Sequence, residues 1–323
     1  MKILITGIHG FVGGNLVSAL KENHTIYGLD IVSPIKEGVS YTFSWDDLEA
    51  GQVPAVDAII HLAGKAHDTK NKAAADVYFK VNTGLTQKIY DYFLRSSAQK
   101  FIFFSTAKAA ADKVDGVLTE EVTPAPVGPY GESKIKAEEY IRAHMPDAST
   151  GSASDTAESA SKQVYILRPC MIHGPGNKGN LNLLYNVVSK GIPWPLGAFE
   201  NRRTFTSIDN LSFVISGLLT KDIPSGIYNM GDDEALSTNE LIEVICESLG
   251  KRTHIWKLPK GLMNGVAKVG GWLHLPLDPE RLRKLTENYI SSNAKIKAAL
   301  GIEKMSVDAR TGLRKTLESF KKK

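Results

Sequence analysis

Short apolar runs alternate with amphipathic segments along the first half of the chain. Runs rich in Ile, Leu, Val and Phe predict buried strands at residues 2–6, 25–29, 55–62, 100–104 and 164–167. Apolar residues that recur every three or four positions predict helices at residues 11–21, 77–93 and 130–143. Because strands and helices alternate, we expect right-handed crossovers and a doubly wound parallel sheet of the α/β class.

The second half of the chain has a different pattern. Gly and Pro punctuate residues 169–204, which predicts loops, and helical periodicity returns at residues 238–249 and 307–320. We therefore expect two parts. The first is a domain made of residues 1–168, to which residues 205–232 return, and the second is a smaller, mostly helical lobe made of residues 169–204 and 233–323.

The composition limits the kinds of partner that we expect for this chain. Lys and Arg number 39, and Asp and Glu number 35, in 323 residues, so the net charge of +4 gives no sign of a nucleic-acid partner. No apolar run reaches the roughly 18 residues of a membrane span. Cys170 and Cys246 are too distant in sequence for a disulfide framework, and free thiols favour the reducing cytoplasm. Residues 147–162, rich in Ala, Ser and Thr, predict an exposed loop extension.

Several histidines lie between residues 9 and 173, but their spacing is not that of a metal site. They include His9, His61, His67 and His173. We therefore expect no bound metal. His61 stands at the end of a predicted strand, where we expect it to pack against neighbouring side chains rather than to act as a base.

A glycine-rich turn joins the first strand to the first helix. It reads Gly7-Ile8-His9-Gly10-Phe11-Val12-Gly13, and its glycines let a pyrophosphate approach the backbone at the helix N-terminus. Asp30 ends the second strand, 17 residues after Gly13, where a carboxylate accepts the ribose hydroxyls of NAD and repels the 2′-phosphate of NADP. No Arg directly follows Asp30. These features predict a Rossmann-like fold that binds NAD in preference to NADP.

Tyr130 and Lys134 are four residues apart on a predicted helix, so the two side chains point into the same space. A phenol with its ordinary pKa of about 10 is a poor base at neutral pH. A cation beside it favours the phenolate, and a decrease of two to three pKa units requires about 3–4 kcal/mol. Such pairs also occur on ordinary helix surfaces. Behind a dinucleotide-binding turn, however, the pair predicts proton transfer.

These residues carry a family resemblance. In order along the chain, the sequence resembles the extended short-chain dehydrogenase/reductase family, and within it the NAD-dependent nucleotide-sugar epimerase/dehydratase branch. The similar segments are the turn 7–13, Asp30, 61–64, 81–82, 105–106, 130–134, 167–169, 173–176 and 203–211. Together they span most of the chain.

The resemblance implies three catalytic residues. Tyr130 would be the general acid and base at the C4 hydroxyl of a sugar. Lys134 would bind the nicotinamide ribose and lower the pKa of Tyr130. Thr106, at the end of its strand, would hydrogen-bond the reacting oxygen.

The resemblance also implies which residues contact the two ligands. The cofactor-binding set is Gly7, Gly10, Phe11, Val12, Gly13, Asp30, Ile31, Leu62, Ala63, Gly64, Asn82, Tyr130, Lys134 and Pro169. The substrate-binding set is Thr106, Asn180, Leu181, Arg203 and Arg281. Arg203 would grip the diphosphate of a nucleotide sugar, because a guanidinium fork suits that bidentate task. Arg281 is one of three candidates for a second phosphate cation, with Arg283 and Lys284.

Two departures from the family pattern bear on the reaction. Dehydratases of this branch commonly carry an Asp-Glu pair directly after the Thr, whereas this chain has Ala107 and Lys108, which argues against dehydration. Many 4-epimerases continue with Val-Tyr-Gly, whereas residues 109–112 read Ala-Ala-Ala-Asp. This resembles a bacterial polysaccharide subgroup that contains both 4-epimerases and 4-keto-sugar reductases.

The resemblance therefore implies an NAD-dependent 4-epimerase of a UDP-hexose or UDP-N-acetylhexosamine, which acts by transient oxidation at C4. The alternative is an NAD(P)H-dependent reductase of a UDP-4-keto-6-deoxy sugar. A non-catalytic NAD-binding regulator is a third hypothesis, against which the intact Tyr130, Lys134 and Thr106 argue. The resemblance also implies a homodimer.

Overall fold

A computed structural model describes residues 1–66, 74–146, 162–177, 179–273 and 277–321. Most of the predicted loop extension at residues 147–162, and His67, lie outside these residues. Within them, no helix combines the length and the apolar character that crossing a bilayer requires.

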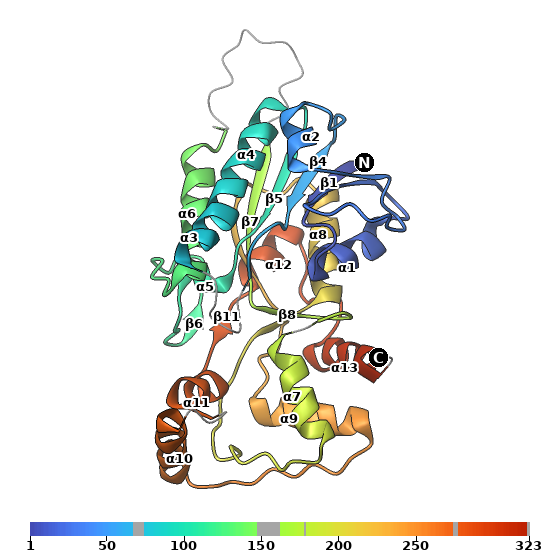
Figure 1. The fold of residues 1–323 in the computed structure, drawn as a ribbon. Coiled ribbons are helices and arrows are strands. Elements are labelled where there is room, and N and C mark those ends of the chain that lie inside the picture. Colours follow the sequence, from blue (N-terminus) through green and yellow to red (C-terminus); the bar gives the residue numbers. More distant parts are fainter. Residues whose placement is uncertain (67–73, 147–161, 178, 274–276, 322–323) are drawn as a thin grey trace.

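A seven-stranded sheet with all strands parallel forms the centre of the molecule (Figure 1). Its strands are β1 (Lys2–Thr6), β2 (Thr25–Leu29), β3 (Tyr41–Phe43), β4 (Ala58–His61), β5 (Lys100–Phe104), β7 (Gln163–Pro169) and β10 (Gly226–Met230). The spatial order is β10-β7-β5-β4-β1-β2-β3. The order of the strands reverses between β1 and β4, which is where a doubly wound sheet binds its ligand. The predicted Rossmann-like fold is therefore confirmed.

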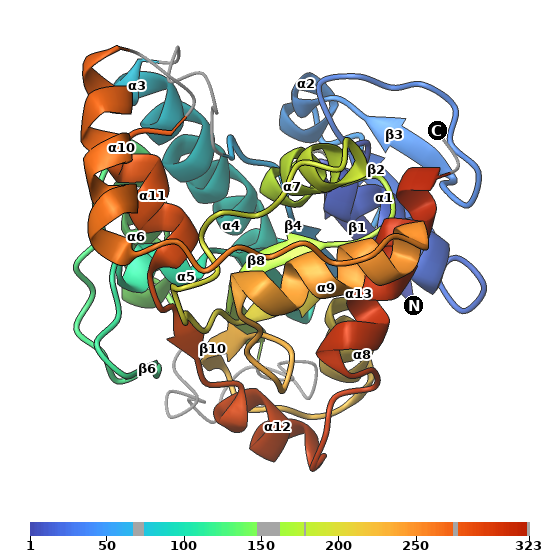
Figure 2. The same cartoon turned by 90° about the horizontal axis from the view of Figure 1, so that it is seen from below.

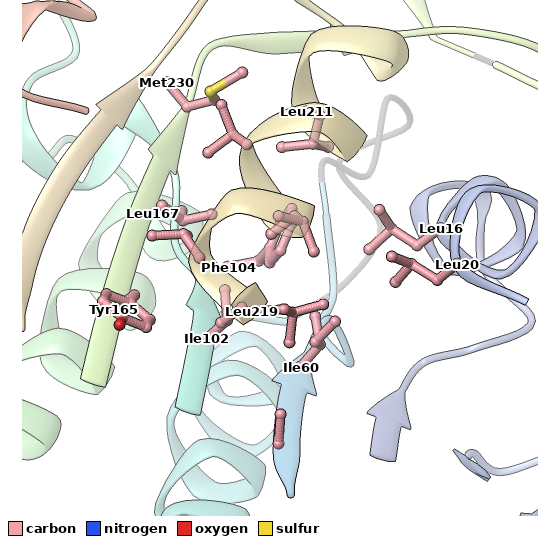
Figure 3. Packing of buried hydrophobic residues seen from close by; sticks show 14 of the residues in the cluster. Leu16, Leu20, Ile60, Ile102, Phe104, Tyr165, Leu167, Leu211, Leu219 and Met230 are labelled. Carbon is pink, nitrogen blue, oxygen red and sulfur yellow. The ribbon is translucent and has the colours of Figure 1, made fainter. Parts of the chain in front are cut away.

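Helices cover both faces of this sheet. They are α1 (Phe11–Leu20), α2 (Trp45–Glu49), α3 (Ala75–Tyr78), η1 (Phe79–Gly84), α4 (Leu85–Arg95), α5 (Ala107–Ala110), α6 (Pro129–Ala143), α8 (Ile208–Thr220) and α12 (Ala294–Leu300). On one face α1, α8 and α12 bury residues such as Leu16 and Leu211 against Ile60 and Ile102, as Figure 3 shows. On the other face α4 and α6 pack on a second buried cluster. Because both faces are buried, the strands read as continuous apolar runs.

The helix predicted at residues 77–93 contains a turn of a different kind. Residues Phe79–Gly84 form a π-helix, η1, between the α-helical segments α3 and α4. The wider turn carries Asn82 into the interior, where its side chain is fully buried. Such π-helical turns are rare and often occur at functional sites.

A smaller lobe lies below the sheet in Figure 1. Its helices are α7 (Asn180–Ser189), α9 (Thr238–Leu249), α10 (Lys260–Trp272), α11 (Pro279–Thr286) and α13 (Ala309–Lys321). These helices enclose a core of their own. Helix α9 begins with a capping box between Ser237 and Glu240 and ends at Gly250, whose φ is +63°. The prediction of loops at residues 169–204 was wrong for α7, which buries Leu181 and Val188 in this core.

Two short pairs of strands lie outside the central sheet. β8 (Met171–His173) pairs with β9 (Phe205–Ser207), and β6 (Val117–Leu118) pairs with β11 (Ile290–Ser291). β8 begins two residues after the end of β7. The chain therefore passes from the central sheet into the smaller lobe beside the carboxyl ends of the strands, where the candidate site lies.

Candidate active site

The glycine-rich turn is tightly packed against the backbone around it. Gly7 has a φ of +68°, and a Cβ there would lie 2.9 Å from the amide nitrogen of Ala63. A Cβ at Gly13 would lie 2.6 Å from the carbonyl oxygen of Gly7. Helix α1 begins directly after Gly10, which brings no side chain to the amides of the first turn. The turn is therefore a backbone cradle at a helix N-terminus, which suits a pyrophosphate.

A loop from the smaller lobe contacts this turn. The side-chain amide of Asn15 donates to the carbonyl oxygens of Phe11, at 2.8 Å, and of Pro175, at 3.0 Å. Gly176 follows with a φ of +85°, and a Cβ there would lie 3.9 Å from the ring of Phe11. The segment at residues 173–176 thus lies against the start of α1, and the predicted cofactor residue Phe11 contacts it.

Asp30 holds the turn to the end of β2. Its carboxylate accepts hydrogen bonds from the amide of His9, at 3.0 Å, and from the amide of Ile31, at 2.7 Å. A carboxylate has about four acceptor positions, so two such bonds leave capacity for ribose hydroxyls. The side chain of Ile31 itself is 85% exposed.

Sequence reasoning missed a cation beside the glycine-rich turn. The ammonium of Lys36 lies 3.2 Å from where a Cβ of Gly14 would be, above the first turn of α1. Lys36 is six residues after Asp30, and only the fold brings it back to the turn. The absence of an Arg directly after Asp30 therefore does not leave this region without positive charge.

Asn82 fixes the backbone that follows β4. Its side-chain oxygen, Oδ1, accepts a hydrogen bond from the backbone amide of Lys65, at 2.7 Å. Its side-chain nitrogen, Nδ2, donates to the hydroxyl of Ser133, at 2.9 Å. A Cβ at Gly64 would lie 3.0 Å from that side-chain oxygen and 3.2 Å from the ammonium of Lys134. Asn82 was predicted to lie beside the cofactor, and in the structure its buried amide ties residues 64–65 to α6.

His61 is fully buried at the end of β4. Its Nδ1 lies 2.7 Å from the hydroxyl of Thr6, and its Nε2 lies 2.9 Å from the hydroxyl of Thr86. Burial holds the pKa of His61 well below its ordinary value, and the charge of Lys134 contributes. The uncharged ring therefore packs between Thr6 and Thr86. Across the described ranges, no three His, Cys, Asp or Glu residues gather in a way that could hold a metal ion.

Helix α6 and the end of β5 bring the three predicted catalytic residues together. Tyr130 is in the first turn of α6, and Thr106 is the N-cap of α5, directly after β5. The two side chains are joined by a hydrogen bond. Burial raises the pKa of the Tyr130 phenol, and the bond with Thr106 opposes part of that increase. This direction is opposite to the predicted decrease, because burial outweighs the other influences of the protein on this phenol.

Lys134 is buried at the centre of the site, with 4% of its surface exposed. Its ammonium donates to the carbonyl oxygen of Phe104, at 2.8 Å, and lies 4.8 Å from the centre of the Phe103 ring. Burial lowers the pKa of Lys134 to about 8, although the negative charge of Glu138 opposes that decrease. The ammonium therefore lies among the end of β5, Gly64 and α6.

A buried ion pair lies beneath these residues, and sequence reasoning missed it. Glu138 is one turn beyond Lys134 on α6, and its carboxylate accepts from Arg168 Nε at 3.0 Å and from Arg168 Nη2 at 2.5 Å. Glu138 and Arg168 are at most 1% exposed. The hydroxyl of Ser105, directly before Thr106, also donates to Glu138. The ion pair therefore fixes the ends of β5 and β7 relative to α6.

Arg203 lies on the substrate-lobe side of the same strand ends. It is half-buried, and its Nη1 donates to the carbonyl oxygen of Lys284 at 2.7 Å. Its charge lowers the pKa of Cys170, although burial dominates and raises that pKa to about 12. Cys170 directly follows Pro169, which is buried at the end of β7, so Arg203 lies near the strand end that carries the predicted nicotinamide residue.

The predicted substrate residues of α7 and α11 differ widely in exposure. Leu181 is 2% exposed in the core of the smaller lobe, so only its backbone, at the start of α7, remains available. The side chain of Arg281 is 60% exposed and lies 3.5 Å from Asp278, in the first turn of α11. Asn180, the first residue of α7, is exposed.

Arg283 is better placed than Arg281. Its guanidinium lies 3.6 Å from the carboxylate of Asp112, which also accepts from Lys108 at 2.8 Å. Lys108 is two residues after Thr106, and its ammonium lies 5.0 Å from the centre of the Tyr289 ring. Among the three candidate cations, the structure therefore connects Arg283 to the end of β5. The sequence could not rank them, because the contact joins residues far apart along the chain.

Comparisons with known proteins agree with this geometry. The profile of the NAD dependent epimerase/dehydratase family matches residues 3–231. The UDP-glucose 4-epimerase of Vibrio cholerae is 31% identical over 277 residues, which cover 80% of this chain and 78% of the relative. The N-acetyl-α-D-glucosaminyl-diphospho-ditrans,octacis-undecaprenol 4-epimerase of Escherichia coli O157:H7 is 25% identical over 272 residues, which cover 82% of this chain and 78% of the relative.

Solved structures give the same fold. The UDP-glucuronic acid 4-epimerase of Bacillus cereus, in complex with NAD, aligns with a TM-score of 0.72 at 21% identity and covers 100% of this chain and 99% of that one. By its family match and its relatives, this chain belongs to the NAD-dependent epimerase/dehydratase family and is an NAD-dependent enzyme of the extended short-chain dehydrogenase/reductase type.

Proposed function

We propose that this enzyme is a 4-epimerase of a UDP-linked hexose or N-acetylhexosamine. The observation that carries the proposal is the contact of Tyr130 with Thr106 at the end of β5, with the ammonium of Lys134 on the same face of α6. The backbone around these groups fits NAD. Gly7, Gly13 and Gly64 have no side chains, and a Cβ at any of them would collide with neighbouring atoms of the cradle. Bound NAD would accept the hydride from C4 and return it.

The proposed roles of the protein groups follow from their positions. Tyr130 takes the proton of the C4 hydroxyl while C4 is oxidised, and Thr106 holds the reacting oxygen by its hydroxyl. Tyr130 returns the proton after the 4-keto sugar has turned its other face toward the nicotinamide. Since burial raises the pKa of Tyr130, the phenolate depends on the positive charges of Lys134 and of the oxidised nicotinamide. Arg203 binds the diphosphate of the sugar nucleotide, with Arg283 as a second cation.

Other parts of the proposal concern the whole molecule. Residues 1–168 and 205–232, with α12 packed on the central sheet, form the NAD-binding part, and the rest of residues 169–204 and 233–323 forms the substrate lobe. We also propose a homodimer, which sedimentation velocity would test directly.

One observation favours a second candidate, a reductase of a UDP-4-keto-6-deoxy sugar. Lys36 puts a cation beside the first turn of α1, directly after the glycine-rich turn. A cation there would accommodate the 2′-phosphate of NADPH. This would suit a reductase, whose cofactor is exchanged at each turnover. An epimerase, by contrast, regenerates its NAD and has no need to release it.

The experiment that separates the candidates measures the cofactor through purification and turnover. The epimerase is expected to retain NAD, and to convert UDP-glucose or UDP-N-acetylglucosamine to the 4-epimer with no net change in absorbance at the nicotinamide wavelength. A protein that loses its cofactor and consumes NADH or NADPH only when a UDP-4-keto-6-deoxy sugar is added is the reductase. If the protein binds NAD but catalyses neither reaction with a panel of nucleotide sugars, both proposals are refuted.

A further inference from the structure

Helix α10 exposes an apolar face that the proposed function does not use. One stripe of this helix, formed by Met263, Ala267 and Gly270, is buried. A second stripe faces outward and consists of Leu262, Val266, Val269 and Leu273, which are 54%, 47%, 54% and 52% exposed. Their spacing of four, three and four residues places all four along one side of the helix.

Tryptophans extend this apolar face. Trp272, in the last turn of α10, is 79% exposed, and Trp256, shortly before the helix, is 55% exposed. Tryptophan is the side chain that most favours the boundary between water and lipid. Figures 1 and 2 both show α10 at the margin of the smaller lobe, away from the central sheet.

The charges carried by the segment that contains α10 are of one sign. Residues 251–273 contain five cations and no Asp or Glu. The cations are Lys251, Arg252, Lys257, Lys260 and Lys268, and all five are exposed. An apolar stripe with Trp at its end and Lys on the opposite side is typical of a helix that lies in the surface of an anionic membrane.

We infer that α10 docks this enzyme on an anionic phospholipid surface. The apolar stripe lies at the boundary of the headgroups and acyl chains, and the five cations attract the anionic headgroups. A second copy of the chain is a poorer partner, because a symmetric contact through this face brings the same five cations together. The contact is peripheral, since α10 does not cross the bilayer.

The test is co-sedimentation of the full chain with vesicles. We expect binding to vesicles of phosphatidylcholine and phosphatidylglycerol in equal parts, weaker binding at high salt, and none to phosphatidylcholine alone. The Leu262→Gln/Val269→Gln double variant should lose binding. Leu183→Gln, which changes an exposed leucine of α7, is the matched control and should bind as the wild type does. The Lys260→Gln/Lys268→Gln variant should bind about 30-fold more weakly, because each lysine near such a surface contributes about fivefold.

Local measurements keep the proposal testable if the double variant does not fold. The emission of Trp272 should shift to the blue when anionic vesicles are added, and Trp272→Phe should remove that part of the shift. Turnover of a nucleotide sugar without vesicles should be the same in wild type and in the α10 variants. Three results overturn the proposal: no binding to anionic vesicles, equal binding by the α10 variants, or a double variant that changes from dimer to monomer, which would assign the face to a second copy.

Discussion

Replacement of Lys134 by Met is expected to stabilise the protein at neutral pH while it abolishes turnover. The wild type keeps this ammonium 4% exposed, and burial lowers its pKa from 10.5 to about 8. The native state thus holds the proton less tightly than the unfolded chain does. A difference of this size corresponds to about 3 kcal/mol of free energy that the charged lysine costs at pH 7.

The loss of the ammonium also has a cost. The carbonyl oxygen of Phe104, which accepts from Lys134 at 2.8 Å, would lose its partner, at roughly 1–3 kcal/mol. Glu138 keeps its bonds from Arg168 and Ser105, so it is not left unpaired. We therefore expect Lys134→Met to raise the free energy of unfolding at pH 7 by about 1–2 kcal/mol.

The pH dependence makes this prediction specific. The wild-type lysine is protonated in both states below pH 8 and in neither state above pH 10.5. Between these values only the unfolded chain binds the proton, so wild-type stability gains with rising pH and the advantage of the variant should disappear.

Urea unfolding of the NAD-free protein at pH 7 and near pH 10 measures both values. Lys136→Met, which changes an exposed lysine on the same helix, is the control and should change stability by less than about 0.5 kcal/mol at either pH. A less stable Lys134→Met variant at pH 7, or a difference that does not vary with pH, would refute the reasoning.

Four further outcomes are expected. Tyr130→Phe should keep NAD affinity and lower turnover by about 10²-fold or more, and turnover within a few-fold of wild type would contradict its role. Asp30→Ala should weaken NAD binding and relax discrimination against NADP in direct titrations; a wild type that already prefers NADP would contradict this. Gly13→Ala puts a Cβ 2.6 Å from a backbone oxygen, so NAD affinity should fall by more than tenfold and stability by about 1–3 kcal/mol, measured by calorimetry and urea unfolding. Arg203→Ala should weaken UDP binding by roughly 10- to 150-fold with NAD present, whereas Arg202→Ala, whose side chain is 58% exposed, should have little effect.

The sequence predicts the sheet well because both faces of each central strand are buried. Runs such as residues 100–104 are then apolar at successive positions. Such a strand can be recognised without deciding which alternate residues face the core. The edge strand β3 was missed because its three residues alternate only once, with Thr42 buried between Tyr41 and Phe43. Helix α10 was missed because its several glycines weaken the helical pattern.

The candidate site contains residues that local sequence patterns predict and others that only the tertiary structure brings together. The positions of Tyr130 and Lys134 follow from a spacing of four residues on one helix, which is local information. The contacts of Lys36 with the glycine-rich turn and of Arg283 with Asp112 depend on tertiary structure, so no local pattern predicts them. The direction of the pKa shift of Tyr130 also could not be predicted, because it depends on how deeply the folded chain buries the phenol.

The buried ion pair of Glu138 and Arg168 sets the balance of charge beneath the site. Tyr130, Lys134 and Glu138 follow one another at intervals of four residues along α6, and Arg168 binds Glu138 from β7. Two cations and one anion leave one net positive charge buried beneath the phenol. Without Glu138, two uncompensated cations would be buried together, and the pKa of Lys134 would fall further, toward the neutral amine. The carboxylate therefore helps to keep Lys134 charged, which is the state that the proposed reaction requires.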